Sequence, residues 1–376
     1  MISEAIILED HVRTIRSKTN GNPSGLSPIG NAENNGAPMR LTQRIPIDQI
    51  QFAADLLKDG GVVAFPTETV YGLGADALNA QAVEKIFIAK GRPSDNPLIA
   101  HVASLDQLQE IARDVSPLAK KLIERFWPGP LTIVVRKKMH LPNAVSAGLD
   151  TVAVRMPDEP LALELIRRVG CPIVAPSANR SGRPSATNWE SVLDDLDGRI
   201  DGIVCGPPTR IGLESTVVDT TTPKPIILRH GAITMEMIAE ACDVMSAGDA
   251  SSELQRRSPG TRHRHYQPQA QVVLFDHLEA LEKESRPVGV LGIAEPSPAV
   301  STRTHAFEAD AFEAQLREKL PTSKILICRT LSQYAECLFR FFRECDSQGI
   351  HKVYCQRVDR QGLGRAIMDR LDRAAE

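Results

Sequence analysis

Two polar loops carry the clearest chemical signals in this sequence. Residues 90–97 (KGRPSDNP) place two cations, a hydroxyl and an amide within seven residues, and their glycine and prolines leave room for a ligand to approach closely. Residues 176–185 (PSANRSGRPS) follow an apolar strand and precede a helix, where open α/β sheets bind ligands. Either loop could cradle a polyphosphate. The alternatives are a solvated, basic helix end for the first loop and an ordinary polar connection for the second.

Further polar side chains stand near the ends of predicted strands: residues 67–69 (TET), Arg155, residues 214–216 (EST) and Arg229. Arg155 could hold a carboxylate through two parallel N–H donors, or it could pair with an acid close by in the sequence. Arg229 could reach a phosphate. The TET and EST residues could equally reflect turn capping and strand propensity, and a lone histidine such as His101 is more often structural than functional.

The familiar signatures of nucleotide binding and nucleophilic catalysis are missing. The sequence has no G-x-x-x-x-G-K-[ST] loop, no G-x-S-x-G elbow and no H-E-x-x-H helix. Residues 72–77 (GLGADA) match a dinucleotide fingerprint, but six residues separate them from the preceding strand, which favours a tight turn. Scattered cations and hydroxyls without a protein nucleophile indicate a reaction that needs positioned substrates and charge neutralisation.

Composition narrows the class of protein. The chain of 376 residues is 42% hydrophobic and 24% charged, which is ordinary for a globular protein. A net charge of −3 and only 4% aromatic residues argue against nucleic-acid binding as the main role. Seven cysteines without a C-x-x-C pair indicate neither a disulfide framework nor a zinc site, and they fit a reducing compartment. No apolar run reaches the length of a membrane span, so we expect a cytoplasmic protein.

The elements that must position these residues form two α/β patterns. Strands are predicted at residues 62–65, 131–135, 151–155, 172–175, 202–205, 215–219 and 225–229, with helices interleaved. A second alternation of strands and helices, with helices expected over residues 278–284 and 309–320, runs from residue 271 to 376 and suggests a smaller doubly wound, Rossmann-like domain. We therefore expect a flexible extension (1–40), a mixed α/β domain (41–245), a long polar linker (246–270) and a C-terminal α/β domain (271–376).

Eight motifs occur in a fixed order between residues 66 and 268: PTETVYGLGADA, KGRPSDNPLIAH, WPGPLTIV, GLDTVAVRMP, APSANRSGRPSAT, GLESTVVD, LRHG and SPGTRHRHYQP. In this order they resemble the threonylcarbamoyl-adenylate synthases of the YrdC-like superfamily, in the longer form with an added C-terminal domain. The resemblance implies a twisted mixed sheet in the catalytic domain. It also implies a nucleotidyltransferase that converts L-threonine, bicarbonate or CO2, and ATP with Mg2+ into threonylcarbamoyl-adenylate and pyrophosphate.

The resemblance also implies roles for individual residues. Threonine would be bound by Thr67, His101, Arg155, Ala175 and Ser215. ATP would be bound by Lys90, Arg92, Ser94, Asn96, Thr151, Ser177, Asn179, Ser185 and Arg229, and by Arg264, His265 and Tyr266 of a linker that folds over the entrance as a lid. No catalytic residue, resident metal or permanent cofactor is implied. The product would pass to proteins that modify adenosine 37 of tRNA, and direct tRNA contact is left open.

Three other functions remain as alternatives. A nucleic-acid-binding module could use a concave basic surface, although the net charge opposes it. A carbamoyltransferase of hydrogenase maturation shares the YrdC-like core, but it would require zinc-finger cysteines that this chain lacks. A regulatory nucleotide binder would release no pyrophosphate when threonine and bicarbonate are supplied.

Overall fold

A computed structural model describes residues 41–246, 257–258, 266–281, 284–294 and 302–376. The predicted extension and most of the predicted linker, including Arg264 and His265, lie outside the described residues. Within the described part of the chain, no helix combines the length and the apolar character that crossing a membrane requires.

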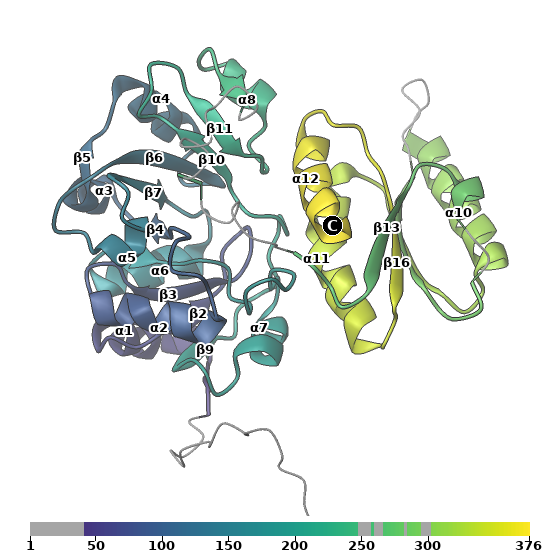
Figure 1. Cartoon of the computed structure of the whole chain (residues 1–376), viewed down its shortest axis with the longest axis horizontal. Coiled ribbons are helices and arrows are strands. Elements are labelled where there is room, and N and C mark those ends of the chain that lie inside the picture. Colours follow the sequence, from purple (N-terminus) through teal and green to yellow (C-terminus); the bar gives the residue numbers. More distant parts are fainter. Residues whose placement is uncertain (1–40, 247–256, 259–265, 282–283, 295–301) are drawn as a thin grey trace, which may run out of the picture. The chain divides into compact units, whose positions relative to one another are not determined.

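The larger sheet is a mixed sheet of twelve strands among the described residues (Figure 1). Its main order is β1-β9-β2-β3-β8-β4-β7-β6-β10-β11-β12, and β5 pairs with β6. It contains both parallel pairs, such as β4 with β7, and antiparallel pairs, such as β6 with β7. The strands are β1 (Gln43–Ile45), β2 (Val63–Phe65), β3 (Gly72–Asp76), β4 (Ile99–His101), β5 (Ala112–Asp114), β6 (Leu131–Lys137), β7 (Thr151–Arg155), β8 (Ile173–Val174), β9 (Gly202–Val204), β10 (Thr216–Asp219), β11 (Ile226–Arg229) and β12 (Met245–Ser246).

Most of the helices around this sheet begin at a residue whose side chain caps the first turn. They are η1 (Ile47–Gln49), α1 (Ile50–Lys58), α2 (Ala80–Lys90), α3 (Leu105–Ile111), α4 (Pro117–Phe126), α5 (Asn143–Ser146), α6 (Pro160–Val169), α7 (Trp189–Leu196) and α8 (Met235–Ala239). Asn79, Ser104 and Ser116 accept hydrogen bonds from the first-turn amides of α2, α3 and α4, as their types and positions predict. Gly91, at φ 60°, ends α2 in the left-handed region, so the chain turns sharply after Lys90.

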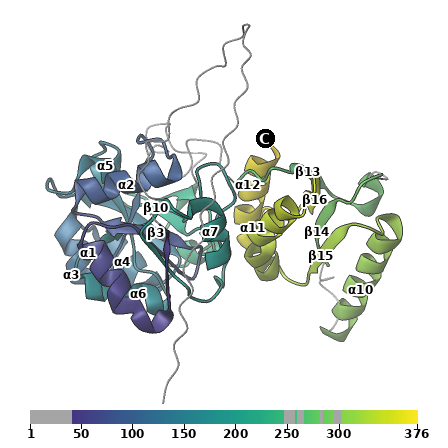
Figure 2. The same ribbon diagram turned by 90° about the horizontal axis from the view of Figure 1, so that it is seen from below.

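The second sheet has four parallel strands in the order β13-β16-β14-β15 (Figures 1 and 2). They are β13 (Gln271–Phe275), β14 (Gly289–Ile293), β15 (Lys324–Cys328) and β16 (Lys352–Gln356). One face packs on α11 (Leu331–Ser347) and α12 (Leu363–Ala375), and the other packs on α10 (Thr302–Lys319). Successive residues divide between these cores because side chains alternate across a strand: Leu291 joins the α11 core, and Val290 joins the α10 core.

Two helices next to the second sheet differ in extent from what the sequence predicts. A helix expected over residues 278–284 is described only as the short 3-10 turn η3 (Leu278–Ala280). A helix expected over residues 309–320 already begins at Thr302. Residues 302–308 carry few apolar side chains, so their hydrophobic periodicity gives no signal for the first turns of α10.

The two sheets are joined by a shared apolar cluster. Val70 and Leu213, from loops of the larger sheet, pack in one cluster with residues of α11 and α12. Gly212 lies against α11 with φ 78°, and a Cβ at this position would overlap the backbone of Ala335 and Glu336. Only glycine therefore suits this position, for reasons both of conformation and of space.

Candidate active site

A cavity lies where loops around the centre of the larger sheet converge. It includes about 580 Å³ of space that no atom fills, counting space open to solvent. The end of β4, the end of β7, the residues before β10 and the end of β11 all contribute to its wall. Residues separated by up to about two hundred positions in the sequence therefore face one space.

Residues expected to bind threonine all line this cavity: Thr67, His101, Arg155, Ala175 and Ser215. Of the residues expected to bind ATP, Arg92, Ser177, Arg229 and Tyr266 also line it. The other described members of this set do not line it: Lys90, Asn96, Thr151, Asn179 and Ser185 are buried, and Ser94 is exposed. All five predicted threonine residues therefore share one cavity with four of the predicted ATP residues.

Arg155 is held in place by three groups. Its Nη2 lies 2.5 Å from Oε2 of Glu68, and both side chains are almost fully buried. Its Nη1 donates to Thr69 Oγ1 at 2.8 Å, and its Nε donates to the carbonyl oxygen of Gly129 at 3.2 Å. The acidic partner of Arg155 is therefore Glu68, which lies far from it in the sequence, and not an acid close by in the sequence. A fixed guanidinium in a cavity is suited to binding a carboxylate.

His101 is buried next to Arg155. Burial, and after it the positive charge of Arg155, lowers the pKa of His101 from 6.5 to about 3. The imidazole is therefore neutral at physiological pH. Its Nδ1 lies 3.3 Å from the carbonyl oxygen of Ile99, and its ring meets Phe65 edge to face with centroids 6.4 Å apart. His101 thus adds polar atoms but no charge to the cavity.

Ser215 and Arg229 are bonded to each other. Arg229 donates from Nε to the carbonyl oxygen of Ser215 at 3.0 Å and from Nη2 to its hydroxyl oxygen at 3.1 Å. The hydroxyl groups of Ser215 and Thr132 lie 2.7 Å apart. A residue expected to bind threonine and one expected to bind ATP therefore form one unit of the cavity wall.

Lys90 connects the two polar loops. Its ammonium donates to the carbonyl oxygen of Ser177 and, at 2.5 Å, to that of Asn179. Burial first, and the nearby Arg92 second, hold the pKa of Lys90 well below its usual value. Residues 90–97 and 176–185 are therefore joined at this point, although about ninety residues separate them in the sequence.

Glu214 is a residue of the cavity wall for which the sequence suggested no role beyond its place in the EST motif. Its Oε1 accepts from Ser185 Oγ at 2.5 Å, and its Oε2 lies 3.1 Å from Nε of Arg370 in α12. Burial alone would raise the pKa of Glu214, but Arg370 and Arg229 outweigh it, so the pKa is lowered. Arg370 itself is fully buried, and no sequence signal connects it to residue 214.

Tyr266 lines the cavity from the end of the predicted linker. Its ring stacks on Phe339 of α11 with centroids 5.2 Å apart, and the guanidinium carbon of Arg370 lies 5.4 Å from the ring centre. Burial raises the pKa of the phenol to about 12, so it keeps its proton. Two helices that pack on the second sheet therefore hold a side chain that faces the cavity.

Among the residues described, no group of three or more His, Cys, Asp and Glu could hold a metal ion.

Comparison with known proteins identifies the family and the fold of this chain. Residues 55–231 match the family model described as "Telomere recombination", and residues 233–376 match "Threonylcarbamoyl-AMP synthase, C-terminal domain". The threonylcarbamoyl-AMP synthase of Pyrococcus abyssi is 39% identical over 352 residues, which cover 90% of this chain and 97% of that protein. The enzyme of the same name from Bacillus subtilis is 43% identical over 338 residues, covering 87% and 93%.

Solved structures agree with these matches. The crystal structure of P. abyssi Sua5 complexed with L-threonine aligns with a TM-score of 0.73 and 36% identity, covering 89% of this chain and 97% of that chain. Fold and site together define the class: the chain is a YrdC-like α/β enzyme of the nucleotidyltransferase type. It belongs to the threonylcarbamoyl-AMP synthase family. The family, fold class and activity predicted from the motifs are confirmed.

Proposed function

We propose that this cavity holds L-threonine and ATP side by side and converts them, with CO2 derived from bicarbonate, into L-threonylcarbamoyl-adenylate and pyrophosphate. The observation that carries the proposal is the single cavity that Arg155 and His101 share with Arg92 and Arg229. Both substrates are anionic where they meet. Their approach therefore requires cations arranged in advance, which cost little reorganisation at the moment of reaction.

Threonine occupies the part of the cavity around Arg155. Its carboxylate pairs with the guanidinium that Glu68, Thr69 and Gly129 hold in place. The neutral His101 and the hydroxyls of Thr67 and Ser215 provide polar contacts without adding charge. With the carboxylate anchored, the amine is free to take up CO2 as a carbamate, with loss of one proton.

ATP occupies the part lined by Arg92, Ser177 and Arg229. Lys90 and Asn179 lie directly behind this wall and hold its backbone. Mg2+ would accompany ATP as part of the substrate and would neutralise charge on its phosphates.

The chemical step needs no nucleophile from the protein. A carbamate oxygen attacks the α-phosphorus of ATP, a new P–O bond forms, and the bond to the leaving pyrophosphate breaks. The protein aligns the two anions and neutralises their charge. Tyr266 lines the cavity, and its ring would limit the access of water to the unstable carbamate and adenylate.

The product serves tRNA modification at adenosine 37 through separate transfer proteins. The seven cysteines are all free thiols, which fits a reducing compartment, and we place the enzyme in the cytoplasm on that ground.

One assay tests the proposed reaction. The full chain is incubated with ATP, Mg2+, bicarbonate and labelled threonine, and the labelled products are separated. We expect labelled adenylate and pyrophosphate in equal amounts, and neither when threonine is omitted. Pyrophosphate release that does not depend on threonine, or tight ATP binding without any turnover, would contradict the proposal and favour a regulatory nucleotide binder.

A further inference from the structure

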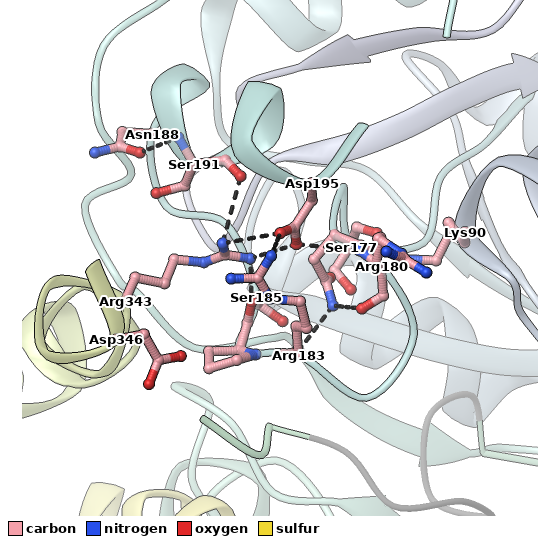
Figure 3. Close-up of polar contacts among 12 residues, drawn as sticks. Lys90, Ser177, Arg180, Arg183, Ser185, Asn188, Ser191, Asp195, Arg343 and Asp346 are labelled. Carbon is pink, nitrogen blue, oxygen red and sulfur yellow. Dashed lines mark hydrogen bonds and ion pairs between the residues drawn. The ribbon is translucent and has the colours of Figure 1, made fainter. Parts of the chain in front are cut away.

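A buried arginine of the C-terminal half of the chain contacts the larger sheet's own loops. Arg343 lies on α11, and its side chain is 6% exposed (Figure 3). Its Nη2 lies 2.8 Å from Oδ2 of Asp195 on α7, and its Nη1 lies 3.4 Å from Oδ1 of the same carboxylate. It also donates to the carbonyl oxygens of Pro184 and Ser191. The guanidinium therefore bridges a helix and the polar loop of residues 176–185.

Asp195 is shared between Arg343 and that same loop. Its Oδ2 accepts from the backbone amide of Arg180 at 3.1 Å, and its Oδ1 pairs with the guanidinium of Arg183. The carboxylate is fully buried, so its orientation depends on the donors around it. Arg343 supplies two of them from across the chain. Loop residues 180 and 183 are thus tied to α11 through one carboxylate.

The other side of the loop is held from within the larger sheet. Lys90 donates to the carbonyl oxygens of Ser177 and Asn179. The side-chain nitrogen Nδ2 of Asn179 donates to the carbonyl oxygens of Arg180 and Arg183 at 2.8 and 2.9 Å. Figure 3 shows Lys90 on one side of the loop and Asp195 with Arg343 on the other. Removing Arg343 would take away the contacts from α11 to Asp195 and to the carbonyl oxygen of Pro184, while Lys90 and Asp195 would still hold other parts of the loop.

We propose that Arg343 is a positioning residue for the ATP half of the reaction. It sets the conformation of residues 177–185 through Asp195, without contact with the substrate. The inference rests on the proposed assignment of this loop to ATP. It gives the C-terminal half a defined part in catalysis: α11 completes the support of the nucleotide loop, whereas the residues around Arg155 are positioned by other groups.

The test compares Arg343→Gln with a matched control, Arg340→Gln, in the full-length chain. Arg340 lies one turn earlier on α11, is partly exposed and pairs with Glu344, so its loss changes the charge of the helix equally but leaves the loop supported. Initial rates of pyrophosphate release give the KM for ATP and for threonine. We expect Arg343→Gln to raise the KM for ATP about tenfold and to change the KM for threonine less than about twofold. Arg340→Gln should match the wild-type enzyme.

Two further variants separate positioning from a general loss of folding. Arg343→Lys keeps the charge but cannot reach all its partners at once, so it should restore part of the ATP affinity. In the double variant Asp195→Asn with Arg343→Gln, the KM for ATP should be no higher than in the worse single variant, because both act through one contact. Effects that multiply would overturn the proposal, as would equal losses for ATP and threonine in Arg343→Lys or in a folded Arg343→Gln.

The failure of the inference is distinguishable from failure of the proposed function. A wild-type chain that forms no adenylate contradicts the proposed function. An active wild-type chain with an unchanged KM for ATP in Arg343→Gln contradicts only the role of Arg343. If Arg343→Gln melts below the assay temperature, Arg343→Lys and the double variant decide the outcome.

Discussion

Glu68 and Arg155 form an ion pair of 2.5 Å in the interior of the protein, at the wall of the active-site cavity. The loop that carries Glu68 and the end of β7 that carries Arg155 meet only in the folded structure. The pair gives Arg155 a counter-charge before any substrate binds, and the hydrogen bonds to Thr69 and Gly129 fix the plane of the guanidinium. A threonine carboxylate that enters the cavity would therefore meet a donor already in position, which limits the entropy lost on binding.

Replacing Arg155 by lysine should weaken threonine binding in particular. Lysine retains the charge but lacks the planar fork that pairs with a carboxylate. We expect the KM for threonine to rise by about tenfold or more, which corresponds to one charge-assisted hydrogen bond, while the KM for ATP stays within about twofold. Steady-state pyrophosphate release measures both. A change in the KM for ATP alone would show that the cavity is divided differently.

Replacing Glu68 by glutamine should lower the free energy of unfolding. It leaves Arg155 buried without a counter-charge, and breaking a buried pair in this way typically costs about 3–5 kcal/mol. Threonine supplies a carboxylate to the same guanidinium. Added threonine should therefore raise the free energy of unfolding more in the variant than in the wild type. Urea unfolding with and without threonine measures this, and equal ligand effects would argue against carboxylate binding at Arg155.

His101 should make stability depend on pH. Its pKa falls from 6.5 in the unfolded chain to about 3 in the folded protein, so below pH 6.5 the unfolded state binds the proton and the folded state does not. This contribution is complete above pH 6.5 and is lost as pH falls toward 3, by about 1.4 kcal/mol per pH unit. We expect His101→Gln to show a shallower loss of stability between pH 6.5 and 5. Parallel unfolding curves for the two proteins would contradict the neutral state of His101.

Removing Arg229 should impair both substrates. The sequence assigned Arg229 to ATP, but the side chain also holds both oxygens of Ser215, a residue expected to bind threonine. We expect Arg229→Ala to weaken the use of ATP by about 2 kcal/mol and to raise the KM for threonine as well. Ser215→Ala is the matched comparison, since it removes one partner and keeps the cation. An effect on ATP alone would mean that the contact with Ser215 carries no function.

Removing the ring of Tyr266 should uncouple pyrophosphate release from product recovery. The ring closes one side of the cavity and is stacked on Phe339. In Tyr266→Ala, water would reach the carbamate and the adenylate, so less adenylate would be recovered per pyrophosphate released. Tyr266→Phe retains the stacked ring and should behave nearly as the wild type. The ratio of the two products, measured at several times, distinguishes these outcomes.

Local signals in the sequence account for much of the fold and of the candidate site. Asn79 and Ser116 cap helices because their side chains reach the free amides of the first turn, a property of a few neighbouring residues. Arg155 and Arg229 end strands, and strand ends meet in a sheet, so their convergence in one cavity follows from the pattern of elements. Residue types at such positions are informative because each signal needs only a short stretch of chain.

The long-range ion pairs could not be predicted in the same way. Arg343 and Asp195 are 148 residues apart, and Arg370 and Glu214 are 156 apart. Each arginine lies on a helix whose neighbouring apolar residues predict a buried face, but nothing in that periodicity says which carboxylate the arginine meets. The position of a partner depends on how the two sheets pack. The sequence likewise marks Glu68 as a polar residue of the TET motif, but it does not predict that Glu68 pairs with Arg155.

The close approach at Gly212 limits how the two halves of such enzymes can be recombined. A chimera that joins the C-terminal half of this chain to the catalytic half of a relative would keep its halves in register only if the recipient also carries glycine at this position. Any larger residue would push α11 away, and Arg343 on this helix would lose its contact with Asp195.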